Sequence, residues 1–195
     1  MKVNIGKFIF VVFVLFQING CASNDKVSLS DFTSDDIKTY KTVNVYARYS
    51  DNTKTDVFVE KGDLYSFIVT GGISIRRWKP VSLTWDGESP LEFLGATIGN
   101  KSNNFPPINA TTEARSNGEI GLYIKEGRFD FEKGKSETPY VYEDNTGKFE
   151  VTIIVWKTKN LDNIADYFKR LAIQNPENEP ISAMHDQAIH LKSVL

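Results

Sequence analysis

Residues 148–157, KFEVTIIVWK, carry the strongest β-strand pattern of the 195-residue chain and decide its expected fold. Phe149, Val151, Ile153 and Val155 are spaced two apart, so they lie on one face of an extended strand. Such alternation is typical of a strand that turns one face toward a hydrophobic core. The chain is therefore expected to contain a sheet whose core-facing side includes these four residues.

The segments before this strand repeat the pattern in short runs separated by turn residues. Residues 42–49 (TVNVYARY) place Val43, Val45, Ala47 and Tyr49 on one face. Two further strands flank the KGD turn in 56–72, and 119–125 (EIGLYIK) alternates again. Short strands with regular turn signals indicate a sandwich. We predict a mainly β fold, an antiparallel β-sandwich of jelly-roll or galactose-binding-like type, over residues 41–158.

Residues 159–195 change from a period of two to a helical period. One stripe holds Leu161, Ile164, Ala165, Phe168 and Leu171, and a second holds Ile181, Met184, Ala188, Leu191 and Leu195. Spacings of three and four put such residues on one helical face. We predict a C-terminal helical hairpin, whose apolar faces, through Phe168, Leu171, Met184 and Leu191, are expected to contact a protein partner if the chain has an assembly role.

The first twenty residues predict export. Lys2 and Lys7 precede the apolar run 8–16 (FIFVVFVLF), which is too short to span a bilayer and ends before Cys21. The segment 1–20 resembles a bacterial lipoprotein signal, which implies a lipid-bearing Cys21, acyl anchorage in the membrane and, with Ala22 following, sorting to the outer membrane. The alternative is an ordinary secretory signal. Residues 21–40 are polar and acidic and are expected to form the tether.

Charge and side-chain inventory argue against two functional classes. Without Lys2 and Lys7 the chain has 21 basic and 25 acidic residues, which is not the basic surface that nucleic acid requires. The two histidines, His185 and His190, are five apart on the last predicted helix, so a metal pair or a Ser-His-Asp triad is hard to assemble. No spacing marks out a carboxylate pair, and we predict a protein that is not an enzyme.

Residues 76–90 (RRWKPVSLTWDGESP) combine cations and aromatic rings in a long predicted loop. Arg76 beside Trp78, with Trp85 nearby, suits an anionic glycan or a partner protein, because aromatic faces stack on sugar rings and attract cations. The other interpretation is that both tryptophans are buried in the sandwich. Arg76, Trp78 and Trp85 are predicted ligand-binding residues.

The segment 141–147 (VYEDNTG) gathers oxygen-bearing side chains directly before the strongest strand. Asp, Asn and Gly also make ordinary turns, because they tolerate left-handed backbone and bond to their own main chain. Carboxylate, amide and carbonyl oxygens are equally the ligands that calcium prefers. The residues alone leave both interpretations open.

The order of segments 59–72, 94–99, 118–127 and 141–153 resembles the LecA-like (PA-IL-type) galactophilic lectins, which are calcium-binding β-sandwiches. The resemblance covers roughly residues 43–156 and implies a calcium ion held by side chains of Glu126, Asp144 and Asn145 and by the carbonyl of Val141, with a further carbonyl near Ile75. The insert 127–140 separates Glu126 from Val141 by more residues than in the family. It leaves open whether the loops that carry these two residues meet. The family's sugar-contacting histidine loop has no counterpart, so galactose specificity is not implied.

These observations predict a non-catalytic lipoprotein of the cell envelope with calcium-dependent glycan binding. The alternative is a structural or assembly lipoprotein that uses the sandwich as a scaffold and the helices for a protein partner.

Overall fold

The computed structural model describes residues 35–75, 81–82, 93–103, 109–177, 180–181 and 183–187. Its strands are β1 (Ile37–Tyr46), β2 (Thr53–Val59), β3 (Leu64–Ser74), β4 (Val81–Ser82), β5 (Leu94–Ile98), β6 (Lys101–Asn103), β7 (Ala110–Glu113), β8 (Gly118–Ile124), β9 (Phe129–Asp130), β10 (Lys135–Ser136) and β11 (Thr146–Trp156). A 3₁₀ helix, η3 (Pro139–Tyr142), precedes β11, and helix α1 (Leu161–Gln174) follows it.

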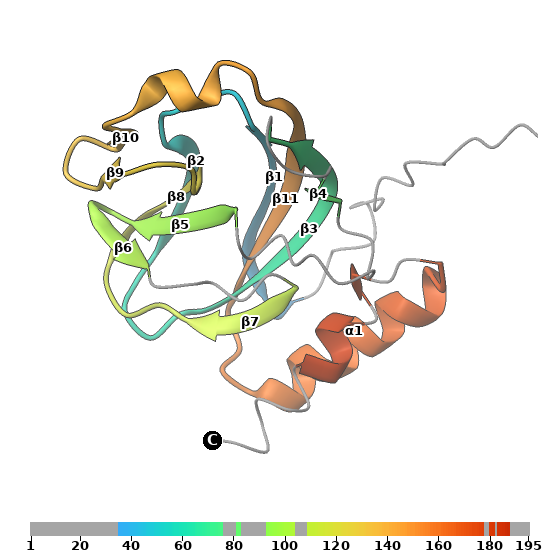
Figure 1. Ribbon diagram of the computed structural model, residues 1–195. Coiled ribbons are helices and arrows are strands. Elements are labelled where there is room, and N and C mark those ends of the chain that lie inside the picture. Colours follow the sequence, from blue (N-terminus) through green and yellow to red (C-terminus); the bar gives the residue numbers. More distant parts are fainter. Residues whose placement is uncertain are drawn as a thin grey trace, which may run out of the picture.

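Nine of the described strands form two facing antiparallel sheets, which confirms the predicted mainly β sandwich (Figure 1), and β9 and β10 pair with each other in a separate hairpin. The larger sheet has the order β1-β11-β3-β4, with β7 also paired to β3, and the smaller has the order β2-β8-β5-β6. The KGD turn joins β2 of the smaller sheet to β3 of the larger, so its two predicted strands are not paired with each other. Asp63 closes this turn by accepting a 2.9 Å hydrogen bond from Glu60 N.

The main hydrophobic core lies between the two sheets. Phe149, Val151, Ile153 and Val155 of β11 are all fully buried in it, as their alternation predicts. Val45 and Ala47 join them from the end of β1, but Tyr49 does not. β1 ends at Tyr46, and Tyr49 lies beyond it with about half of its surface exposed, 49%, so the face predicted for Val43, Val45, Ala47 and Tyr49 does not extend to Tyr49.

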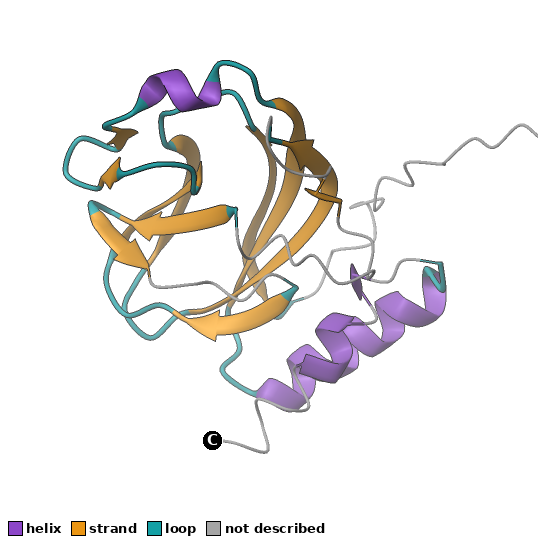
Figure 2. Cartoon of the chain, viewed as in Figure 1, coloured by secondary structure: helices purple, strands orange, loops and turns teal. Residues whose placement is uncertain are grey.

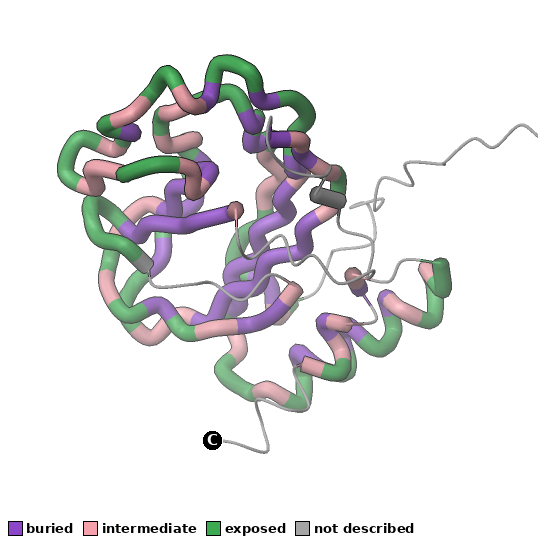
Figure 3. The backbone as a smooth tube through the Cα atoms, viewed as in Figure 1, coloured by how far each residue is buried: buried purple, intermediate pink, exposed green. Residues whose placement is uncertain are grey.

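A second core covers the outer face of the larger sheet. Ile154 and Trp156, on the opposite side of β11, pack there with helix α1. Asn160 caps the helix by accepting a 2.9 Å hydrogen bond from Asp162 N, and residues 180–181 and 183–187 are also helical. Figure 3 shows buried residues along both sheets and on one side of α1. The sheet thus has no solvent-facing side where the helix lies.

This second core corrects the prediction of a helical face available to a partner. Phe168, Leu171 and Met184 are 0%, 3% and 0% exposed, and they contact the chain's own sheet. Leu191 lies outside the described residues. An amphipathic stripe predicts that a face is buried, but it does not tell whether the covering surface belongs to the same chain.

Within the described residues, no helix combines the length and apolar character that a membrane crossing requires. The predicted signal segment 1–20 and the tether up to residue 34 lie outside them.

Candidate functional site

Glu126 and Asn145 meet at one end of the sandwich. Glu126 follows strand β8, and Asn145 directly precedes β11. Asn145 Nδ2 donates a 2.5 Å hydrogen bond to Glu126 Oε2 and a 3.2 Å hydrogen bond to the carbonyl of Ala47. The insert 127–140 therefore does not keep these two loops apart. Figure 2 shows η3, which leads into this site, at the opposite end of the sandwich from α1.

The last residue of η3, Tyr142, fixes the backbone at Glu126. Its hydroxyl lies 3.0 Å from the carbonyl oxygen of Ile124, contacts the carbonyl of Glu126 and accepts a 3.2 Å hydrogen bond from Glu126 N. Burial raises the pKa of Tyr142 above its usual value, so the hydroxyl stays protonated at neutral pH. Tyr142 was not predicted as part of the site, although it stands between Val141 and Asp144 in the quoted segment.

Asn145 contributes a side-chain oxygen that has no hydrogen-bond donor among the described residues. Its side chain is only 3% exposed, and Oδ1 is buried with no hydrogen-bond partner among the described residues. A buried polar atom without a partner costs about 1–3 kcal/mol, so such atoms are rare in folded proteins. Because Nδ2 faces two acceptors, the amide orientation that leaves Oδ1 unpartnered is also the one that the hydrogen bonds favour.

The remaining predicted ligands are near Asn145 in the chain or in the sheet register. Asp144 is exposed beside Asn145, and Val141 is half-buried with its N–H donating to the Thr138 carbonyl at 3.2 Å. Ser74 pairs with Thr146 in the sheet register, which places Ile75 beside Asn145. Gly147 has a φ of 85°, a left-handed conformation that glycine adopts freely, so the chain turns tightly into β11.

This donor set fits calcium in chemical type. Calcium takes six to eight oxygens from carboxylates, amides, carbonyls and water. Glu126 and Asp144 offer carboxylates, Asn145 an amide oxygen, and Val141 and Ile75 are placed to offer carbonyls. The described residues contain no cluster of three or more His, Cys, Asp or Glu side chains able to hold a metal, so a site here relies on the amide and the carbonyls.

Two exposed tyrosines that the sequence did not single out border this site. Tyr46 and Tyr49 are 40% and 49% exposed, and their ring centroids lie 5.3 Å apart. Lys148 Nζ lies 5.8 Å from the Tyr46 centroid, and Arg48 lies 5.5 Å from that of Tyr49. Ala47, between the tyrosines, accepts the hydrogen bond from Asn145. The alternating pattern of 42–49 hid this pair, because it placed Tyr49 on the same strand face as Val43, Val45 and Ala47.

The other predicted site residues are not part of this arrangement. Arg76, Trp78, Trp85 and Cys21 lie outside the described residues. His185 Nδ1 lies 3.1 Å from the carbonyl oxygen of Ala165, a contact between the second helical segment and α1.

Comparison with known proteins gives a likeness in structure but none in sequence. No family model matches it, and no curated protein matches its sequence. Among solved structures, the chain is similar to the EclA N-terminal domain, described as a PllA-like lectin, with a TM-score of 0.42 and 19% identity over 58% of this chain and 94% of that chain. The antiparallel sandwich is established by the strand pairing of this chain itself.

Proposed function

We propose that the chain is a non-catalytic binding protein of the cell envelope that recognises glycan through a calcium ion held by Glu126, Asp144 and Asn145. The observation that carries this proposal is the buried Oδ1 of Asn145, which has no hydrogen-bond donor among the described residues. Oxygen ligands of a cation are held in this way, because a donor at the same oxygen would compete with the ion.

The residues around the loop keep this oxygen in place. The bonds from Asn145 Nδ2 to Glu126 and to the Ala47 carbonyl fix the amide plane, and Tyr142 fixes the backbone of Glu126. Buried, hydrogen-bonded side chains pre-organise a site, which lowers the entropy lost on binding. Calcium bound by these residues would offer coordination positions to a vicinal diol of a sugar.

Tyr46 and Tyr49 support a sugar ligand at the same edge. Their exposed rings lie beside the loop, and aromatic faces pack against the apolar faces of sugar rings. Neither residue is needed for the fold of the core, since both rings are at the surface. We assign them as the glycan-contacting surface next to the calcium loop.

We also propose that Cys21 carries the lipid that anchors the protein, which rests on the signal pattern of 1–20. Incorporation of a labelled fatty acid that is lost in Cys21→Ser supports this, whereas unchanged labelling rejects it. The assembly role through the C-terminal helices is not put forward, because Phe168, Leu171 and Met184 are covered by the sheet.

The test of the calcium loop is thermal unfolding of the protein in EDTA and in excess calcium. At about 100 times the Kd, a ligand stabilises the folded state by about 2.7 kcal/mol, which raises the Tm of a domain of this size by roughly 5–10 °C. Asp144→Ala is expected to abolish this rise. The matched control, Glu143→Ala, removes the neighbouring exposed carboxylate and is expected to keep the calcium-dependent rise in Tm. A calcium response equal in both variants, or absent in the unmodified chain, contradicts the proposal.

A further inference from the structure

A second polar cleft lies on the outer side of the smaller sheet, away from the candidate calcium loop. Its volume is about 380 Å³, within the range of small-molecule sites. Strands β2 and β8 form its floor, the turn between β5 and β6 forms one rim, and the β9–β10 hairpin forms the other. Gly121 in this floor and Glu126 at the calcium loop are five residues apart, roughly 17 Å along an extended chain.

The floor of the cleft contains an orphaned polar atom. Asn52 Nδ2 donates a 3.0 Å hydrogen bond to Thr97 Oγ1, while Asn52 Oδ1 is buried and has no partner among the described residues. Asn52 lies directly over Gly121, where a Cβ would stand 2.6 Å from Oδ1 and in still closer contact with Nδ2. The absence of a side chain at Gly121 therefore gives Asn52 its place, and the cleft its depth.

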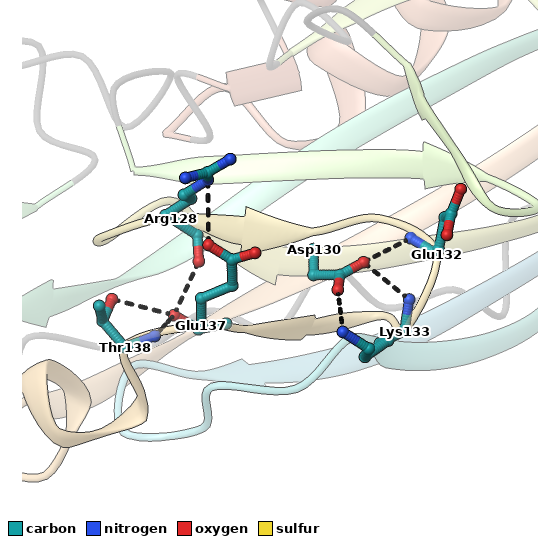
Figure 4. Close-up of polar contacts among 7 residues, drawn as sticks. Arg128, Asp130, Glu132, Lys133, Glu137 and Thr138 are labelled. Atoms are coloured by element: carbon teal, nitrogen blue, oxygen red, sulfur yellow. Dashed lines mark hydrogen bonds and ion pairs between the residues drawn. The ribbon is translucent and has the colours of Figure 1, made fainter.

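The hairpin rim is held rigidly by contacts of its own. Asp130 accepts hydrogen bonds from Glu132 N, Lys133 N and Lys133 Nζ at 3.0, 3.1 and 2.7 Å, which close the turn (Figure 4). Asn52 N donates to the carbonyl of Gly134 at 2.8 Å and ties the turn to the floor. On the other side of the hairpin, Tyr123 of β8 stacks on Phe129 with centroids 4.1 Å apart. The insert 127–140 thus builds a fixed wall over the sheet.

The charged groups in the cleft are balanced in sign. Asp51, Glu119 and Glu132 face it together with Lys54, Lys133 and Lys135. Lys133 is paired with Asp130, whereas the ammonium groups of Lys54 and Lys135 form no ion pair within the described part of the chain. The cleft therefore offers both donors and acceptors with no excess charge, which matches hydroxyl groups that both donate and accept.

We propose that this cleft binds an uncharged saccharide unit of a glycan, independently of calcium. The hydroxyls of the sugar would accept from Lys54 and Lys135 and donate to the carboxylates of Asp51, Glu119 and Glu132. A strongly anionic ligand is disfavoured by the three carboxylates, and a cationic ligand by the lysines. Strand β8 passes through the floor of the cleft and ends next to the calcium loop. The protein would therefore hold one glycan at two points, which raises the apparent affinity for that glycan.

The test is an NMR titration of the ¹⁵N-labelled full-length chain in EDTA, which removes any contribution of the calcium loop. The probes are N-acetylglucosamine and maltose as uncharged sugars, glucuronate as an anionic sugar, and inorganic phosphate. The uncharged sugars are expected to shift the backbone amides of Asn52, Gly121 and Gly134 in a saturable manner. Binding in EDTA supports this cleft even if calcium proves to have no effect on stability, so the two proposals fail separately.

A paired variant assigns the shifts to the cleft. Lys54→Met with Lys135→Met removes two charged donors and is expected to weaken binding at least about tenfold, because a hydrogen bond to a charged group contributes about 1.5–3 kcal/mol. The control, Lys157→Met with Lys169→Met, makes the same charge change at exposed positions elsewhere and leaves the affinity unchanged. The proposal is overturned if neither uncharged sugar shifts these amides, if phosphate or glucuronate binds more tightly, or if the paired variant binds normally.

Discussion

At the scale of single residues, the hydrogen bonds of Tyr142 connect the insert to the candidate calcium loop. Its ring is 1% exposed, and its hydroxyl meets the backbone of both Ile124 and Glu126 at the end of β8. The lectin resemblance implied that Glu126 and Asn145 belong to one site, but nothing in the sequence identified the tyrosine that positions Glu126. The chain has eight tyrosines, and the sequence alone does not show which of their hydroxyls hydrogen-bonds to the backbone at the site.

Tyr142→Phe is expected to destabilise the protein by about 1 kcal/mol at neutral pH, because two carbonyls and one N–H lose a partner. Burial raises the pKa of Tyr142 above the ordinary value of 10.0. Its contribution to stability is thus full below about pH 10 and declines as the pH rises through the folded-state pKa. The difference in unfolding free energy between the two proteins should narrow over that range, as measured by urea denaturation.

The same variant bears on function, since Tyr142 acts through Glu126 and does not itself supply a ligand oxygen. Tyr142→Phe should weaken calcium binding while leaving a measurable rise in Tm with calcium, unlike Asp144→Ala. A variant that loses stability yet binds calcium with unchanged affinity would show that Tyr142 has only a structural role.

At the scale of elements, strand β11 supports both cores of the protein. Phe149, Val151, Ile153 and Val155 face the smaller sheet, and Ile154 and Trp156 face helix α1. Trp156 also donates a 2.8 Å hydrogen bond to Ser66 Oγ, and its ring meets Tyr167 and Phe168 edge-on at 5.2 and 5.6 Å. Residues 153–156 (IIVW), at the end of β11, do not alternate between apolar and polar side chains, because this part of the sheet is covered on both sides.

Phe168→Ala is expected to cost about 3–5 kcal/mol of unfolding free energy, because it leaves a cavity between α1 and the sheet. Ile173 stands on the same helix with 71% of its surface exposed, and Ile173→Ala should change stability by less than about 0.5 kcal/mol. Denaturant unfolding of both variants makes the comparison. Similar losses for the two would mean that α1 does not pack as described.

At the scale of the whole molecule, the helices and the sandwich form one stability unit. The outer face of the larger sheet presents Ile37, Leu64, Ile68 and Ile154, all buried under the helical residues. A sheet face of this composition is not stable in water by itself, because exposed apolar patches promote association.

A chain ending at residue 159 is therefore expected to melt at a lower temperature and to aggregate or bind a hydrophobic dye. A chain ending at residue 187 keeps Ile181 and Met184, both fully buried, and should retain the full-length Tm. Differential scanning calorimetry with light scattering measures both effects. If the chain ending at residue 159 stays monomeric and keeps the Tm of the longer chain, the helices are not needed to cover the sheet, and a role in partner binding would be favoured.

The sequence by itself determined the mainly β character of the chain and the core face of β11, because both depend on spacing within a segment. That Glu126 and Asn145 lie together was implied only by the lectin resemblance, and the insert 127–140 left it open whether their loops meet. Alternation of period two fixes which side chains share a face of a strand, whatever the strand packs against. The tertiary structure alone decided what covers each face, and it placed the helices on the sheet, Tyr49 at the surface and the insert over β8. These contacts join residues far apart in the chain, so no local pattern records them. The amide of Asn145, for example, is oriented by Ala47 after β1 and Glu126 after β8, and its Oδ1 is buried without a partner among the described residues.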